Sequence, residues 1–212
     1  MVTSQARLPA IFIGDAQALD FLNSIATPID ARVDWLGDGA GLLSWLGQAG
    51  LVPVTVLEHM RSQSSPGELN EVAERARKLR EWFRGFLQER MGRPVQRLDL
   101  KKLEPLNRLL ERDQSFSQIA TATGPDSNAL ELQAMRRWSS PDALLLPIAA
   151  SLAHLVCVED FTCIKACEGP NCTLLFADHT RNRARRWCSM ASCGNRAKQA
   201  AHRQRRGKAP PR

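Results

Sequence analysis

The sequence predicts an α+β protein, in which a mostly helical N-terminal domain with a small β-hairpin or sheet is followed by a small cysteine-rich module. Apolar residues recur at helical spacing through most of residues 1–160. Within residues 116–138 the pattern changes to two extended runs around a turn of Gly, Pro, Asp, Ser and Asn. Beyond residue 160, two equally spaced cysteine pairs lie in a polar, basic segment.

The first elements follow from the hydrophobic period. A short strand is expected at residues 11–13 and a helix at 16–26, where Leu19, Leu22 and Ile25 share one face. Two further helices are expected, one that begins at residue 42 and ends at Gly50 and one at 53–60.

Stronger signals mark the middle of the chain. Residues 65–68 (Ser-Pro-Gly-Glu) combine a capping box with proline at the first helical position, which predicts the start of a long helix through Phe86. Another helix is expected at 99–112. The runs 118–123 and 129–135 then predict the two strands of a β-hairpin.

Residues 140–142 (Ser-Pro-Asp) cap an apolar run from Ala143 to Val158. This run has 16 residues and contains a proline, a serine and a histidine, so it falls short of a bilayer span and predicts a buried helix. The start of the chain lacks a secretory signal pattern. We therefore expect a cytoplasmic protein.

The net charge of +7 is unevenly distributed. From His179 to Arg212 there are 11 Lys and Arg residues and no Asp or Glu, which leaves 18 basic and 22 acidic residues before them. The body therefore carries −4 and the tail +11, which indicates a polyanionic partner for the tail. A solvated, disordered tail is the alternative interpretation for residues 203–212.

The cysteine spacing predicts a metal site. Two C-x4-C pairs, separated by 15 residues, are formed by Cys167, Cys172, Cys188 and Cys193. Two such pairs complete the tetrahedral four-thiolate shell of one structural Zn²⁺. The second pair leads into a predicted helix, so the order of knuckle, hairpin and ligand-bearing helix is that of a treble clef. Cys157 and Cys163 lie in apolar surroundings and are expected to be ordinary buried cysteines.

Residues 176–198, which contain the string Cys-Gly-Asn-Arg at 193–196, resemble the CGNR zinc-finger family. Residues 18–24 (Ala-Leu-Asp-Phe-Leu-Asn-Ser) and 45–51 (Trp-Leu-Gly-Gln-Ala-Gly-Leu) resemble the opening motifs of the ABATE domain, which precedes the finger in that family. The family's usual Asn-Thr appears here as Asn23-Ser24, which retains the hydroxyl but not the methyl group.

This resemblance implies a stress-induced transcription regulator, with an ABATE-like ligand-binding domain at 1–160 and a treble-clef finger with a basic tail at 161–212. The expected partners are DNA, an unidentified small-molecule effector and a second copy of the chain, since one small finger gives limited specificity. The predicted DNA contacts are Arg181, Arg183, Arg185, Arg186, Asn195, Arg196, Lys198, Arg203, Arg205 and Arg206.

For the effector, Asp20 and Asn23 are neighbours at i, i+3 on the first helix and form a candidate binding pair. A hydrogen-bond network at the end of the helix is the alternative interpretation. Two other functions stay open. RNA binding has the same compositional signature as DNA binding, and an HNH-like nuclease would use residue types present at His179, Asn182 and His202. The order of these residues is not convincing for a catalytic cation site at His179, so we expect no catalytic residues and no enzyme.

Overall fold

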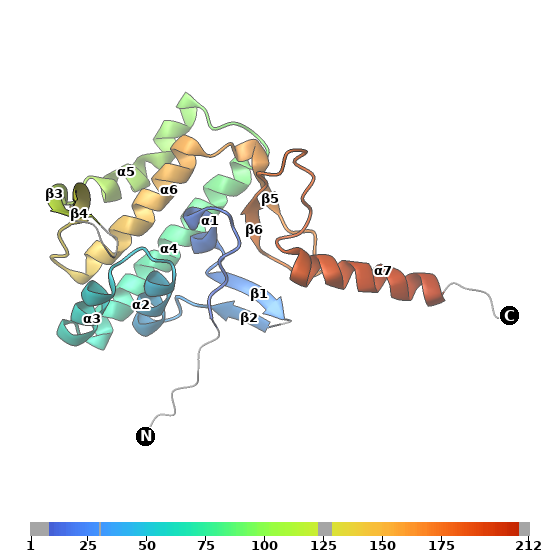
Figure 1. Cartoon of the computed structure of the whole chain (residues 1–212), viewed down its shortest axis with the longest axis horizontal. Helices are drawn as coiled ribbons and strands as arrows, with labels where there is room; N and C mark the ends of the chain where they lie inside the picture. The colour runs from blue at the N-terminus through green and yellow to red at the C-terminus, as the bar shows by residue number, and fades with distance from the viewer. Residues whose placement is uncertain (1–8, 30, 123–128, 208–212) are drawn as a thin grey trace, which may run out of the picture.

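The computed structural model describes residues 9–29, 31–122 and 129–207. Its N-terminal part is a group of helices packed around one long helix, and a small finger with a projecting helix follows (Figure 1). The helices are α1 (Gln17–Leu22), α2 (Gly39–Gln48), α3 (Val54–Gln63), α4 (Pro66–Arg90), α5 (Glu104–Leu110), α6 (Leu146–Val158) and α7 (Asn195–Gly207). The strands are β1 (Ile25–Ile29), β2 (Ala31–Asp34), β3 (Ser115–Thr121), β4 (Leu130–Arg136), β5 (Ile164–Ala166) and β6 (Leu175–Ala177). They form three separate antiparallel pairs, β1 with β2, β3 with β4 and β5 with β6.

The central helix α4 begins as the sequence predicts. The Ser65 hydroxyl accepts from the backbone N–H of Glu68 at 3.2 Å, and the Glu68 carboxylate accepts from the N–H of Ser65 at 2.7 Å. This capping box satisfies two N–H groups that the first helical turn leaves without a partner. The apolar face of α4 packs against α1 and α2.

A buried arginine joins α4 to the first hairpin. Arg80 is 1% exposed and donates two hydrogen bonds of 2.8 Å to the carboxylate of Asp34 on β2, and a third of 2.9 Å to the Ser24 hydroxyl. Burial alone would raise the pKa of Asp34, but the hydrogen bonds from Arg80 hold it below its usual value. The Ser24 hydroxyl therefore has a buried partner within the fold.

Two predictions for the N-terminal segment are wrong. Helix α1 ends at Leu22 rather than at residue 26, because the side chains of Asn23 and Ser24 hydrogen bond to distant elements and the chain then turns into strand β1. Residues 11–13 are extended but belong to no sheet. The N–H that follows them, that of Gly14, donates to the Asp20 side chain at 2.8 Å instead of to a strand.

The other predicted helices are present with shifted bounds. The helix expected at 99–112 consists of a 3₁₀ turn at Arg97–Leu103 followed by α5, and the buried helix begins with a 3₁₀ turn at Pro141–Leu145. Proline lies in the first turn of both α5 and α6. A proline has no N–H to donate to the preceding turn, so it favours a new helical start there.

The apolar segment Pro141–Val158 meets the length and composition of a membrane span, and half of it is buried in the fold. Its helix α6 packs against α1 and α5, and the side chains of Ile148, Leu152 and Leu155 lie in the core. We therefore assign it as a core helix, as the sequence predicts. Cys157 near its end is exposed rather than buried, because it lies on the outer face of α6, whereas Cys163 is buried as expected.

The predicted hairpin is confirmed as β3 and β4, in which Ile119 lies opposite Leu132. The turn predicted at 124–128 lies outside the described residues. The hairpin stands at the edge of the helical group (Figure 1) and leaves Ile119, Leu130 and Leu132 69%, 73% and 73% exposed. The sequence pattern does not predict the short β1–β2 and β5–β6 pairs, whose strands are three to five residues long.

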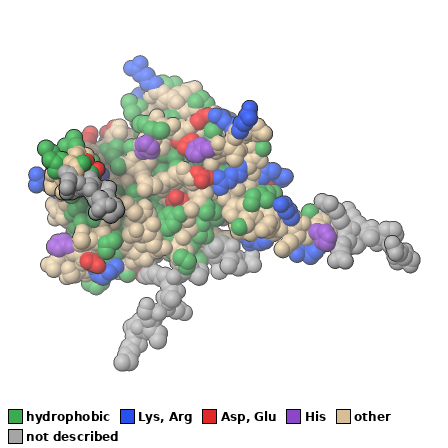
Figure 2. All heavy atoms as spheres, in the orientation of Figure 1, with side chains coloured by type: hydrophobic (Ala, Val, Ile, Leu, Met, Phe, Trp, Pro, Cys, Tyr) green, Lys and Arg blue, Asp and Glu red, His purple; other side chains and the backbone are tan. Residues whose placement is uncertain are grey.

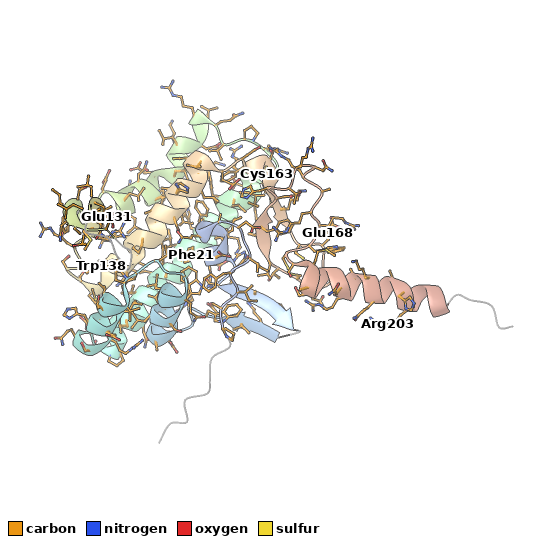
Figure 3. All side chains as sticks on the ribbon, in the orientation of Figure 1. Phe21, Glu131, Trp138, Cys163, Glu168 and Arg203 are labelled. Carbon is orange, nitrogen blue, oxygen red and sulfur yellow. The ribbon has the colours of Figure 1, made fainter. Side chains whose placement is uncertain are left out.

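The finger and the helical domain share one hydrophobic core. Phe161 lies edge-on to Phe86 of α4 at a centroid distance of 6.3 Å, and Leu175 and Phe176 of β6 are buried beside helix α1. Phe21 of α1 lies at the centre of the molecule (Figure 3). The two parts are therefore joined by packed side chains.

Candidate metal centre and nucleic-acid interface

The four predicted zinc ligands come together in space. The sulfur atoms of Cys167, Cys172, Cys188 and Cys193 all lie within 4.8 Å of one another. Two of the separations are 3.8 Å, from Cys172 to Cys188, and 3.7 Å, from Cys188 to Cys193. Tetrahedral thiolates at about 2.3 Å from a Zn²⁺ are roughly 3.8 Å apart. The cluster therefore fits one structural Zn²⁺.

The first pair lies in the loop between β5 and β6. Its turn contains Asn171, whose φ of 60° is a left-handed conformation that asparagine tolerates. A Cβ on Gly169 would lie 2.8 Å from the sulfur of Cys193, so only glycine leaves room for that ligand. The backbone N–H of Gly169 donates to the Cys167 sulfur at 3.4 Å, and the N–H of Cys188 donates to the same sulfur at 3.2 Å.

The second pair lies at the start of α7. The Ser189 hydroxyl accepts from the N–H of Ala191 at 3.2 Å and opens a π-helical turn, Met190–Gly194, that carries Cys193. A Cβ on Gly194 would lie 2.7 Å from the sulfur of Met190. The next two residues of the string are tied back to this turn, since Asn195 donates to the carbonyl of Ala191 and Arg196 to the sulfur of Cys193.

The electrostatics of the four thiols favour a cation. A hydrogen bond from the Cys188 thiol lowers the pKa of Cys172 to about 5. The same bond raises the pKa of Cys188, and burial adds to that increase. Four thiolates at this spacing would repel one another strongly, so they ionise together only when a divalent cation neutralises them.

A buried aspartate holds the loop between the two cysteine pairs. Asp178 is fully buried and accepts from Lys165 at 2.7 Å, from Thr180 at 2.6 Å and from the N–H of Arg185 at 2.9 Å. Burial alone would raise its pKa, but the hydrogen bonds from Lys165 and Thr180 hold it well below the usual value. No sequence pattern indicated this role for Asp178, although it is the last acid before the wholly basic tail.

The loop arginines that are predicted to contact DNA differ in the contacts that they make within the protein. Arg185 donates to the carbonyls of Trp187 and Cys188, pairs with Asp15 and stacks over Phe176 at 4.2 Å. Its guanidinium therefore fixes the loop and ties it to the N-terminal domain.

Three other loop arginines are exposed. Arg183 pairs with Asp160 at 3.0 Å, and Arg186 pairs with Glu168 at 2.6 Å while lying over the Trp187 ring. Surface pairs of this kind contribute little stability, so a phosphate can replace the carboxylate. Arg181 is exposed in the same loop.

Helix α7 presents an exposed cationic surface. Asn195, Arg196, Lys198 and Arg203 are exposed. Arg203 lies in the part of α7 that projects beyond the fold (Figure 3), and Lys and Arg side chains gather over the finger (Figure 2). The side chains of Arg205 and Arg206 lie outside the described residues. Residues 203–207, for which a disordered tail was the alternative, belong to α7, and 208–212 lie outside the described residues.

The two residues of the predicted effector pair, Asp20 and Asn23, differ in their access to a ligand. The Asn23 side chain is fully buried and donates to the carbonyl of Leu175 at 2.8 Å, while its oxygen accepts from the N–H of the same residue at 2.9 Å. Asp20 is half-buried, and burial raises its pKa to about 6. The structure thus brings Asn23 to the finger and Asp20 to Gly14.

The residues that the nuclease alternative would use, His179, Asn182 and His202, lie in different surroundings. The ring nitrogen Nε2 of His179 lies 3.0 Å from the carboxylate of Glu159, at the end of α6. His202 is exposed on α7, and Asn182 is exposed in the loop.

The fold and the thiol cluster together define a protein of the zinc-finger class, with a helical domain followed by a four-cysteine finger. Comparison with models of protein families identifies both parts. The ABATE model, described as "Putative stress-induced transcription regulator", matches residues 15–159, and the model of the CGNR zinc finger matches residues 164–206. The chain therefore belongs to the ABATE family, and its C-terminal part is a CGNR zinc finger. A comparison with curated proteins finds no match.

Proposed function

We propose that this protein is a DNA-binding transcriptional regulator that contacts DNA through residues 161–212 and receives a small-molecule signal through residues 1–160. The observation that carries the proposal is the exposed cationic surface of α7 and its neighbouring loop. Beyond Asp178 the chain has 11 basic and no acidic residues. Helix α7 extends away from the body (Figure 1), so a DNA groove has access to it.

Within this proposal the contacts have different roles. Lys198 and Arg203 meet phosphates, as do Arg205 and Arg206 further along the helix. Asn195 and Arg196 lie at the helix start, where a side chain enters the major groove and reads a base edge. Arg181, Arg183 and Arg186 reach the flanking backbone, and Arg185 supports them from within the loop.

The test is a binding titration of the zinc-loaded full chain with duplex DNA, single-stranded DNA and structured RNA at several salt concentrations. If roughly five cations meet phosphates, the log–log salt slope on duplex DNA is about −4 to −5. The double variant K198Q/R203Q is expected to lower this slope by about two.

Its matched control is K78Q/R108Q, which removes two cations that are 73% and 74% exposed on the helical domain. Equal losses in both double variants would contradict the assignment to α7. Tighter binding of structured RNA than of duplex DNA would favour the RNA-binding alternative.

We further propose that the protein acts as a homodimer, because one small finger covers few base pairs and twofold symmetry doubles the site. The exposed apolar face of the β3–β4 hairpin supports this, since an isolated two-stranded hairpin is marginally stable without a covering surface. Analytical ultracentrifugation of the full chain tests it. The variant I119S/L132S should then be monomeric at concentrations at which the parent is dimeric.

We propose no catalytic role. Incubation of the purified protein with duplex DNA and Mg²⁺ tests this directly. Cleavage that is lost on substitution of His179 would favour the nuclease alternative.

A further inference from the structure

A cavity of about 510 Å³ lies between helices α1 and α6. Small side chains create the space, since Ala16 and Ala18 at the start of α1 face Ala150 and Ser151 of α6. Leu155 and Val158 extend the apolar wall along the same face of α6. A volume of this size accommodates a small organic molecule.

Two of the three charged side chains that line this cavity are carboxylates. Arg136 lines it, but two hydrogen bonds of 2.7 Å to Asp113 neutralise that guanidinium. His154 is the other basic side chain in the lining, and two carboxylates, Asp15 and Glu159, complete it. An apolar wall with two carboxylates suits a ligand that has an apolar body and a positive charge.

Both carboxylates also contact the finger. Asp15 pairs with Arg185, and Glu159 lies 3.0 Å from His179. Arg185 in turn donates to the backbone carbonyl of the zinc ligand Cys188. The acidic end of the cavity is therefore the place where the helical domain meets the basic loop of the finger.

We propose that this cavity binds a small apolar amine, whose ammonium group donates to Asp15 and Glu159, and that binding increases the affinity of the finger for DNA. A carboxylate accepts several hydrogen bonds, so the ammonium joins Arg185 and His179 at the same oxygens. It adds a positive charge beside the basic loop, and the loop is then more attractive to phosphates. By linkage, DNA tightens amine binding by the same factor. This last step rests on the proposed function.

The probe is 2-phenylethylamine, titrated calorimetrically into the zinc-loaded full chain, with 2-phenylethanol and phenylacetate as neutral and anionic controls of the same shape. Fragments of this size bind proteins with dissociation constants of about 10 mM or lower. The amine is expected to bind roughly ten-fold or more tightly than the alcohol, because a charge-assisted hydrogen bond adds to the shared apolar contact. Phenylacetate is expected to bind most weakly.

Three variants locate the site. A150F fills the cavity and should lower amine affinity by about ten-fold or more. The double variant D15N/E159Q should abolish the preference for the amine over the alcohol without blocking the alcohol. D160N is the matched control, because Asp160 pairs with the finger residue Arg183 but does not line the cavity. D160N retains the helix cap at this position, since asparagine also caps helices. This variant should leave amine binding unchanged.

In the second arm, DNA affinity is measured with and without saturating amine, and a gain of about five-fold or more is expected. Absence of saturable amine binding up to about 10 mM, or a preference for phenylacetate, overturns the proposal. Amine binding that D15N/E159Q and A150F leave unchanged also overturns it. Amine binding without any DNA binding would instead overturn the proposed function and leave the cavity assignment intact.

Discussion

Asn23 of helix α1 forms a reciprocal pair of hydrogen bonds with the backbone of Leu175 in the finger. Its amide donates to the Leu175 carbonyl at 2.8 Å and accepts from the Leu175 N–H at 2.9 Å. The side chain thus serves strand β6 as a neighbouring strand would, across 152 residues of sequence. The two parts of the chain are therefore connected by a buried polar link as well as by apolar packing.

Substitution of Asn23 by alanine should destabilise the whole protein. N23A leaves a buried N–H and a buried carbonyl without partners, which costs about 2 to 5 kcal/mol in the free energy of unfolding. Denaturant unfolding of the zinc-loaded chain measures it. N182A deletes an exposed amide and is the control, expected to change stability by less than about 0.5 kcal/mol. A loss in N23A no larger than in N182A would show that the link contributes nothing.

Features that depend on residues close together in the sequence could be predicted, whereas features that depend on distant residues could not. The start of α4 was predictable, because the Ser65–Glu68 capping box is formed within four residues. The metal ligands were predictable because their spacing alone specifies two chelating pairs. The role of Asn23 was not, since its partner Leu175 lies in another part of the chain.

The same reasoning explains the errors near the N-terminus. The Ile25–Ala26 period suggested a longer helix α1, but the ion pair of the buried Arg80 with Asp34 fixes that segment as a hairpin. Likewise, sequence alone treats Arg183, Arg185 and Arg186 as equivalent cations. Only the folded loop shows that Arg185 is directed to backbone carbonyls and Phe176.

Loss of one zinc ligand should remove the metal and unfold the finger. C172S is expected to contain no zinc by elemental analysis, whereas the parent contains one per chain. Because β6 shares a core with α1, the damage should extend to that interface and lower the thermal stability of the whole chain. C157S replaces an exposed cysteine outside the cluster and should retain one zinc. Equal zinc contents in the two variants would contradict the four-cysteine assignment.

Alanine should have opposite effects at two glycines. In G169A the new Cβ would lie 2.8 Å from the Cys193 sulfur, so the metal site must distort and its zinc affinity should fall. Gly85 lies in α4, and no atom lies within 4 Å of a Cβ built there. G85A should therefore gain up to about 1 kcal/mol from helix propensity. Competition with a chelator and thermal unfolding measure the two effects, and normal zinc affinity in G169A would argue against the tight fit.

Asp20 should make stability depend on pH. Burial raises its pKa from 3.8 to about 6 in the folded protein. The folded state therefore holds this proton more tightly than the unfolded state does, so stability falls as pH rises from about 4 to 6 and the cost is complete above pH 6.

D20N keeps an oxygen that accepts from Gly14 but has no charge to bury. After solvent screening it should gain on the order of 1 kcal/mol at pH 7, roughly 2 to 4 °C in melting temperature. Near pH 4 it should match the parent. E58Q, at an exposed acid on α3, is the control. A lower melting temperature of D20N at pH 7 would mean that the ionised carboxylate stabilises the fold.

Arg196 should affect DNA sequence recognition more than general DNA affinity. It is exposed at the start of α7 and donates to the Cys193 sulfur at 3.4 Å, so it belongs to both the metal site and the proposed interface. R196A should cost about 1 to 3 kcal/mol more on a selected DNA site than on a scrambled one, because a bidentate base contact is lost. K198A, two residues along the helix, should weaken both DNAs alike. Titrations at several salt concentrations compare R196A with K198A. They are made in excess zinc, because removal of a group that contacts a metal ligand lowers metal affinity by about 10- to 100-fold. Zinc content measured on the same samples separates the two roles of Arg196. Equal losses on both DNAs with zinc fully bound would remove the base-reading role and leave Arg196 as a support for Cys193.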